Sequence, residues 1–286
     1  MKKERIIYYQ DELNDDFAGN NIKVKPIKNN YKYIRHSWIF KVNAFLLKYL
    51  IAVPILWFLD TFIFRVKIEN KKVLKYFKKK GYYIYANHVL PFDPVVLPLK
   101  TQLRKKTVII AGHELFSINA FVSDTVSHLY AIPTPNNDKE MFDRFSECLS
   151  YYINKGERVL IFPEAHIWPY YNNIRNFKAV SFRFPCDDSA PVFVATTTFK
   201  KRKGNRKPKP IIYIDGPFFP DESLDYRDRV NDLRERVYEA MCYRAHNENN
   251  FAYIEYKKKC ICVLDFPKNH VTMRVLVQYR FRLQKE

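Results

Sequence analysis

The sequence predicts an α/β fold, in which a layered, largely parallel central sheet is flanked by helices and preceded by an apolar, membrane-associating helical segment. From residue 81 onward, short runs of β-branched and aromatic residues alternate with longer stretches of helical periodicity. The chain has 286 residues, 47% of them hydrophobic, which is enough for one large core. The apolar segment, residues 38–64, lies before this alternation begins.

Residues 1–37 form a polar N-terminal arm of mixed charge, which we expect to be loosely ordered. Acidic residues stand where a cleavable signal peptide would have its apolar region, so none is expected. The five cysteines include no Cys-x-x-Cys pair, which is typical of a reducing compartment rather than of a disulfide framework. We therefore expect a location in the cytosol or on the cytosolic face of a membrane.

The apolar segment 38–64 is interrupted by Lys48, Pro54 and Asp60. A membrane-spanning helix needs about 20 mostly apolar residues, and this segment reaches that length only by including the lysine and the proline. The pattern favours a pair of helices broken near Pro54 and lying in one leaflet, with Trp38 and Trp57 in the interfacial zone. The alternative is a helix buried in the core.

Two basic runs contribute to the net charge of +19. Residues 65–80 carry eight Lys or Arg against one Glu and directly follow the apolar segment, an arrangement that holds proteins on an anionic membrane surface. Residues 200–209 are interpreted more simply as a loop that connects two strands. Neither run shows the aromatic interleaving typical of RNA recognition, and no helix-turn-helix or zinc-finger spacing is present, so we expect no nucleic acid partner.

The α/β domain is expected to occupy residues 65–256. The predicted strands are residues 82–86, 107–111, 158–162, 191–199 and 210–215, and the clearest helices are Asp138–Lys155 and Leu224–Ala245. Residues 257–286 form a C-terminal extension, expected to be a β-hairpin around a Pro-Lys-Asn turn. We find no functional interpretation for this extension.

The stretch Tyr85–Val96 contains Asn87-His88 and, five residues after the histidine, Asp93. On one continuous helix, a five-residue step would place the two side chains about 140° apart, so they could not meet. Here the strand 82–86 ends before His88, and Asp93-Pro94 is typical of a helix start with aspartate at the N-cap. The edge where parallel strands end is also where ligands bind in open α/β sheets. The pair is therefore either a catalytic base with its carboxylate or a turn that contains both.

Four features in order resemble the glycerophospholipid acyltransferase family, over roughly residues 65–220. They are the Asn-His-x4-Asp motif, Phe162-Pro163-Glu164 after a strand, Phe177-Lys178, and Ala190-Pro191-Val192 at the start of another strand. Three departures accompany them. Ala165, His166 and Ile167 replace the family's usual Gly and Arg, residues 128–138 lack the arginine usual there, and Leu90 replaces a common Ser or Thr.

The resemblance implies that His88 is the general base and that Asp93 orients it. It also implies substrate binding by Glu164 and Asn87, with Arg175 and Lys178 as candidates, together with Arg144, to replace the missing arginines. The acyl donor would be acyl-CoA or acyl-carrier protein as co-substrate, with no cofactor and no metal. The acceptor would be a lysophospholipid or other lipid alcohol, most simply 1-acylglycerol-3-phosphate, at an anionic membrane surface.

The altered Phe-Pro-Glu-Ala-His segment leaves a competing hypothesis, a non-catalytic membrane-binding protein on the same scaffold. His166 raises the question of a metal, but no second ligand stands at zinc spacing. Trp168, Tyr170 and Tyr171 are interpreted either as the lining of an acyl or acceptor groove or as core packing.

Overall fold

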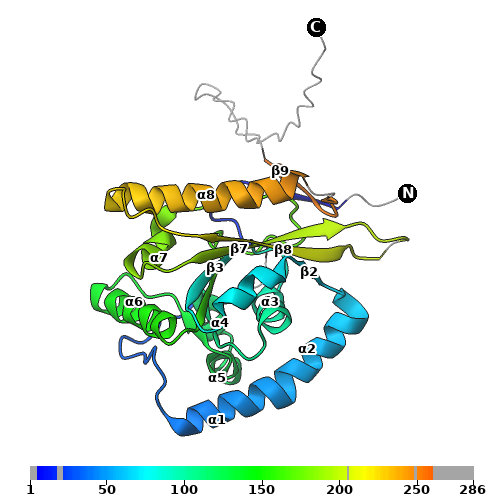
Figure 1. Ribbon diagram of the computed structural model, residues 1–286. Helices are drawn as coiled ribbons and strands as arrows, with labels where there is room; N and C mark the ends of the chain where they lie inside the picture. The colour runs from blue at the N-terminus through cyan, green and yellow to red at the C-terminus, as the bar shows by residue number, and fades with distance from the viewer. Residues whose placement is uncertain (1–4, 18–21, 205, 248–249, 260–286) are drawn as a thin grey trace, which may run out of the picture.

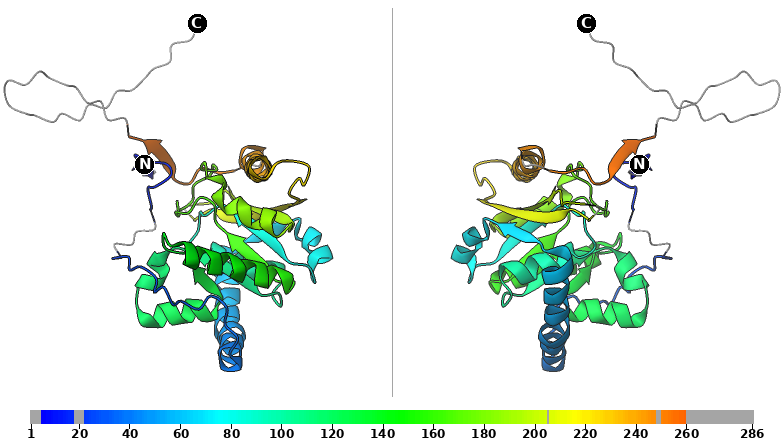
Figure 2. Two further views of the ribbon diagram at one scale, coloured as in Figure 1. Left: turned by 90° about the vertical axis from the view of Figure 1, so that its left-hand side faces the viewer. Right: turned by 90° about the vertical axis from the view of Figure 1, so that its right-hand side faces the viewer.

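The computed structural model describes residues 5–17, 22–204, 206–247 and 250–259 (Figure 1). Most of the predicted C-terminal extension, residues 257–286, therefore lies outside the described residues, and the hairpin expected there stays a prediction. The described part includes a central sheet with helices on both faces and a long apolar helix at one side (Figures 1 and 2).

The central sheet has seven strands in the part of the chain that is described, in the order β2-β8-β7-β3-β6-β4-β5. Strands β7, β3, β6, β4 and β5 are parallel, β8 is antiparallel to β7, and β2 is parallel to β8. The bounds are β2 Lys67–Glu69, β3 Tyr82–Ala86, β4 Thr107–Ala111, β5 Ala131–Pro133, β6 Arg158–Ile161, β7 Val192–Lys200 and β8 Lys209–Phe218. This arrangement confirms the predicted α/β fold with a largely parallel sheet.

Helices cover both faces of the sheet, which gives three layers. On one face, α6 (Lys139–Asn154), the 3₁₀ helix η4 (Ala179–Phe182), α7 (Arg183–Asp187) and α8 (Tyr226–Asn247) pack around Tyr83, Tyr85 and Val159. On the other face, the 3₁₀ helix η3 (Lys71–Phe77), α3 (Asp93–Thr101), α4 (His113–Ser117) and α5 (Ala120–His128) pack around Tyr82, Ile84 and Leu160. Residues of one strand alternate between the two cores, as the period of two requires.

The apolar segment forms a single helical rod, Trp38–Phe64, and the predicted break near Pro54 is wrong. The rod consists of α1 (Trp38–Leu46), a π-helical stretch η1 (Leu47–Ala52), α2 (Val53–Leu59) and a second π-helical stretch η2 (Asp60–Phe64). Proline removes one backbone donor and crowds the preceding turn, and the wider π-helical turns that end just before Pro54 accommodate this without a break. Figure 1 shows the rod as a curved helix along the lower side of the molecule.

The rod's apolar side chains are mostly exposed, which rules out the alternative of a core helix. Only 6% of its most apolar 18-residue window is buried. By length and composition it is the one helix among the described residues that could cross a membrane. Both views of Figure 2 show it as the lowest part of the molecule, below the helices that flank the sheet.

The N-terminal arm is more ordered than we expected from its polar sequence. Residues Ile6–Tyr9 form strand β1, which pairs in parallel with β9 (Glu255–Lys258), so the predicted boundary after residue 256 falls inside a strand. Further along, the Tyr33 ring is buried in the core beside α6. Strand β1 could not be predicted because its partner β9 lies near the far end of the chain, and local sequence patterns do not reveal pairing over that distance.

Candidate active site

The site is built on the loop that joins β3 to α3 at the carboxyl edge of the sheet. Asn87, the first residue after β3, is buried, and its side chain bonds the backbone of β7 twice. Its Oδ1 accepts a hydrogen bond from the Thr197 amide at 2.7 Å, and its Nδ2 donates to the Thr197 carbonyl at 3.1 Å. Both polar ends of the amide are thus engaged inside the protein. Asn87 fixes the start of the loop, and its part in substrate binding stays a prediction.

Replacing Asn87 with alanine is expected to lower the free energy of unfolding by about 2–4 kcal/mol, because two buried backbone groups of Thr197 would lose their partner. Urea denaturation measures this. Asn119→Ala is the matched control, since that side chain caps the exposed start of α5 at 2.8 Å from the Val122 amide and its loss should cost about 1 kcal/mol. An equal loss in both variants would show that Asn87 does not anchor the loop.

His88 and Asp93 face each other across the loop, as the sequence predicted. The His88 Nδ1 atom lies 3.8 Å from Asp93 Oδ2, within ion-pair distance but longer than a hydrogen bond. Nδ1 is buried and forms no hydrogen bond with the described residues, while the imidazole stacks on the Phe162 ring with centroids 4.4 Å apart. Catalytic hydrogen bonds are often long in ligand-free sites and shorten when substrate binds. The pair can therefore form a base and its orienting carboxylate.

Asp93 also shapes the loop, although not as the helix cap that we predicted. The cap position is Phe92, and Asp93 is the first residue of α3. Its Oδ2 accepts hydrogen bonds from the backbone amides of Val89 at 3.0 Å and Leu90 at 2.7 Å. Burial raises the pKa of the Asp93 carboxyl, and the nearby His88 opposes that rise. The Asp93 carboxylate thus has two roles. It holds the backbone of the residues after His88, and it presents an oxygen to the His88 ring.

Glu164 is buried beside the start of the His88 loop. Its Oε2 accepts a hydrogen bond from the His88 backbone amide at 3.3 Å, and its Oε1 accepts one from the Arg175 amide at 3.0 Å. The Arg175 guanidinium lies 3.4 Å from Oε2. Burial raises the pKa of the Glu164 carboxyl, although the Arg175 charge acts in the opposite direction. Glu164 therefore supports the backbone of His88.

Arg175 is the buried counter-ion of Glu164 and does not offer a free cation to a ligand. Its side chain is 1% exposed, donates to the carbonyls of His166 and Glu12, and lies over the Trp168 ring at 4.9 Å. Arg175, one of the three candidates to replace the family's missing arginines, is thus committed to internal contacts.

The other two substitutes lie elsewhere. Lys178 is exposed just before η4, and Arg144 bonds the carbonyl of Asn29 and pairs with Glu140.

The segment after Glu164 runs alongside the His88 loop and is joined to it by backbone hydrogen bonds. The Trp168 amide donates to the His88 carbonyl at 3.2 Å and the Tyr170 amide to the Val89 carbonyl at 2.9 Å. Trp168 is fully buried, stacked on Tyr256 with centroids 4.9 Å apart. Of the two interpretations left open for this aromatic group, core packing holds for Trp168. Sequence reasoning missed these contacts because they involve backbone atoms, which no residue pattern identifies.

Ala165 has the left-handed backbone conformation, with φ at 62°. This is the position where the resembled family usually has glycine, and glycine adopts that conformation without the steric cost that a Cβ brings. The turn required at this point is therefore retained even though the residue has changed.

His166, the next residue, has its Nδ1 3.9 Å from an Asp16 carboxylate oxygen. No group of three or more His, Cys, Asp or Glu that could hold a metal gathers among the described residues.

A family model and a solved structure each match part of this chain. The model of the acyltransferase family matches residues 65–193. Among solved structures, the 1-acyl-sn-glycerophosphate (LPA) acyltransferase PlsC from Thermotoga maritima is similar at 17% identity and a TM-score of 0.46, over 74% of this chain and 99% of that one. No curated protein matches the sequence.

Proposed function

We propose that the chain, whose residues 65–193 match the model of the acyltransferase family, moves a fatty acyl group from a thioester to a lipid hydroxyl. The thioester would be that of acyl-CoA or acyl-carrier protein. The observation that carries the proposal is the His88–Asp93 pair, which lies inside the matched residues at the carboxyl edge of the sheet. An alcohol is a poor nucleophile at neutral pH, so a positioned base is the main chemical requirement of this reaction.

In the proposed mechanism, His88 takes the proton of the acceptor hydroxyl as that oxygen attacks the thioester carbonyl. The new C–O ester bond forms, the C–S bond breaks, and the proton passes from the imidazolium to the departing thiolate. Asp93 holds the ring orientation and stabilises the imidazolium, as carboxylates do in catalytic triads. No acyl-enzyme is required, and the sequence contains no Gly-x-Ser-x-Gly motif for one.

Glu164 acts in this proposal through the backbone rather than on the acceptor. Its carboxylate binds the His88 amide, and Arg175 in turn holds the carboxylate in place. A general base must stay within hydrogen-bond distance of the proton that it removes, because a small displacement of the base lowers the reaction rate strongly. The buried Glu164–Arg175 pair supplies that rigidity at the His88 amide, and Asp93 supplies it at the amides of Val89 and Leu90.

For the acceptor we propose 1-acylglycerol-3-phosphate, on the strength of the motif resemblance. The test is an acceptor screen with the purified protein, one labelled acyl thioester, and product detection by mass spectrometry. The screen includes 1-acylglycerol-3-phosphate, lysolipids with zwitterionic headgroups, and a glycolipid. Acylation of 1-acylglycerol-3-phosphate well above the others supports the assignment. A folded protein that acylates none of them would favour the non-catalytic membrane-binding alternative.

We further propose that the rod Trp38–Phe64 lies along a membrane, on its cytosolic face. Three contacts spaced along its length support this orientation, since they hold the rod lengthwise against the domain. Phe40 stacks on His128 with centroids 4.5 Å apart, Lys48 Nζ donates to the Leu103 carbonyl at 2.8 Å, and Asp60 pairs with Lys100. The side chains on its outer side, including Trp38, Leu50 and Trp57, are 65–73% exposed.

The double variant Leu50→Asp/Trp57→Asp is expected to bind vesicles at least about tenfold more weakly than the wild type. Each of these side chains would gain about 1.5–3 kcal/mol on leaving water, and 1.4 kcal/mol corresponds to a factor of ten. Vesicle co-sedimentation measures the change. Val180→Asp/Phe219→Asp is the control, because these side chains are also more than half exposed but lie outside the rod. Equal loss in both double variants would contradict the proposed orientation.

A further inference from the structure

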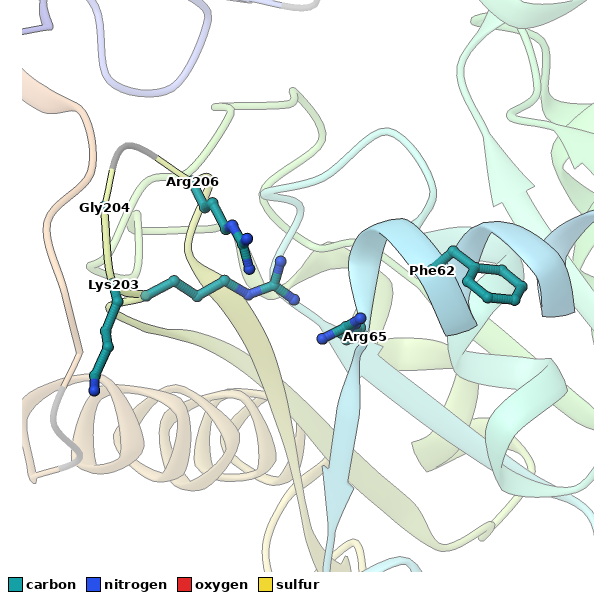
Figure 3. A pocket seen from close by; sticks show the side chains of 6 residues that line it. Phe62, Arg65, Lys203, Gly204 and Arg206 are labelled. Carbon is teal, nitrogen blue, oxygen red and sulfur yellow. The ribbon is translucent and has the colours of Figure 1, made fainter.

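A basic hollow of about 880 Å³ lies where the end of the rod meets the β7–β8 loop. It is lined by Phe62, Arg65, Arg202, Lys203, Gly204 and Arg206. Two of these residues come from the rod's end and four from the basic run 200–209, which we had interpreted as a simple connecting loop. Figure 3 shows Arg65 and Arg206 directed toward a common space, whereas Lys203 points away from it.

Backbone geometry brings the two segments together at this hollow. Arg65 ends the rod in a left-handed conformation, with φ at 54°, and its amide donates to the Asp60 carbonyl at 2.6 Å. The Arg202 guanidinium donates to the Phe64 carbonyl at 3.1 Å and to the Ile63 carbonyl at 3.4 Å. Arg202 thus satisfies carbonyl groups at the C-terminal end of the rod, where a cation is favourable. The loop is fixed to the rod by this contact.

The charges of the hollow are not balanced by carboxylates of the described residues. None of Arg65, Arg202, Lys203 and Arg206 has a carboxylate partner among the described residues, and no acidic residue lines the hollow. Arginines elsewhere do have such partners, for example Arg236 with Asp232. Burial lowers the pKa of Arg202, and the neighbouring charges of Arg65 and Arg206 lower it further. Guanidinium groups that crowd one another in this way are stabilised when an anion binds between them.

The surroundings of the hollow indicate what kind of anion fits. Phe58, Phe62 and Ile63 lie on the adjoining part of the rod and are each more than half exposed. On the inner side, Phe64 stacks on Phe92 with centroids 3.7 Å apart, which connects this corner to the loop that carries His88 and Asp93. An anion bound here would have an apolar surface beside it, as the phosphate of a membrane lipid has.

We propose that Arg65, Arg202 and Arg206 form a binding site for the phosphate headgroup of an anionic membrane phospholipid. A phosphomonoester is preferred over a phosphodiester because it carries more charge and offers three free oxygens to the guanidinium groups. The site would add headgroup recognition to the apolar contact of the rod. It goes beyond the proposed acyl transfer, because headgroup binding requires neither His88 nor an acyl donor.

The test is co-sedimentation of the full-length protein with phosphatidylcholine vesicles that contain either phosphatidic acid or phosphatidylglycerol, matched for surface charge. The wild type is expected to bind the phosphatidic acid vesicles at least several-fold more tightly. Arg65→Gln/Arg202→Gln/Arg206→Gln should lose that preference. The matched control Lys78→Gln/Lys79→Gln/Lys80→Gln removes the same number of charges from exposed residues before β3 and should keep it.

Arg202 also contacts the end of the rod, so replacing it could affect folding. Arg206→Gln alone therefore serves as a second variant, because the Arg206 side chain has no hydrogen bond to the described residues. This variant should reduce the preference for phosphatidic acid vesicles without affecting folding. Loss of the preference in the lysine variant, or its retention in the arginine triple variant, would overturn the assignment. Titration with inorganic phosphate, and separately with a short RNA, distinguishes a lipid headgroup from free phosphate and from the phosphates of a nucleic acid. Tight binding of either one without vesicles, abolished by the arginine substitutions, would also overturn it.

Discussion

Replacing His88 with alanine is expected to lower acyl transfer by roughly 10²–10⁴-fold, the usual contribution of a positioned general base. The fold should be retained, because the imidazole forms no hydrogen bond through Nδ1 with the described residues, and its main contacts there are the Phe162 ring and Asp93. Initial rates with a labelled thioester measure the effect, and circular dichroism checks the fold. His246→Ala on α8 is the control, since that side chain is exposed and bonds only a carbonyl of its own helix.

Asp93→Asn is also expected to lower acyl transfer, measured as initial rates with the same labelled thioester. The carboxamide oxygen can still accept hydrogen bonds from Val89 and Leu90, so the loop should keep its shape. It carries no charge to stabilise the imidazolium, and in the serine protease triad the corresponding change costs about 10⁴ in rate. Full activity in either the His88 or the Asp93 variant would exclude the base mechanism.

Arg175→Met is expected to lower the free energy of unfolding by about 3–5 kcal/mol, because it leaves the Glu164 carboxylate buried without its cation. Denaturant unfolding measures this. Arg236→Met removes an ion pair whose side chains are about one-third exposed, and should cost no more than about 1 kcal/mol. Adding Glu164→Gln to Arg175→Met should restore part of the loss. A loss at Arg175 no larger than at Arg236 would show that the buried pair does not support the site.

The difference in unfolding free energy between the wild type and Arg175→Met should depend on pH. The reason is the Glu164 carboxyl, whose pKa is already raised by burial. A carboxyl with a raised folded-state pKa binds its proton more tightly in the folded protein, so its stability contribution is present at low pH and is lost as pH rises. Removing Arg175 raises the pKa of Glu164 further. The gap between variant and wild type should therefore widen as the pH increases through the titration range of Glu164.

The strands and the proximity of His88 to Asp93 could be predicted because their signals are local. Strands β3 and β4 occupy the residues predicted for them, since buried parallel strands appear as short β-branched and aromatic runs. His88 and Asp93 could be placed at one edge because a strand ends and a helix begins between them. Strands β2 and β5, of three residues each, are too short to show a pattern.

The remaining features depend on contacts between distant segments, which no single stretch of sequence reveals. Arg175 was expected to bind a ligand because its partner Glu164, in another segment, could not be identified in advance. Pro54 was expected to break a helix because the π-helical turns before it leave no mark in composition. The basic loop 200–209 could not be recognised as part of the proposed phosphate site until its contact with the end of the rod was known.

The most direct test of the proposed function is product mass spectrometry after incubation of the wild type and His88→Ala with one labelled acyl thioester and 1-acylglycerol-3-phosphate in vesicles. We expect the wild type to form the diacyl product, with the label in its new ester and an equal amount of free thiol. His88→Ala, bound to the same vesicles, should form at least about 100-fold less. Equal product from both proteins would contradict the role of His88, and a folded, vesicle-bound wild type without diacyl product would contradict the proposed acceptor.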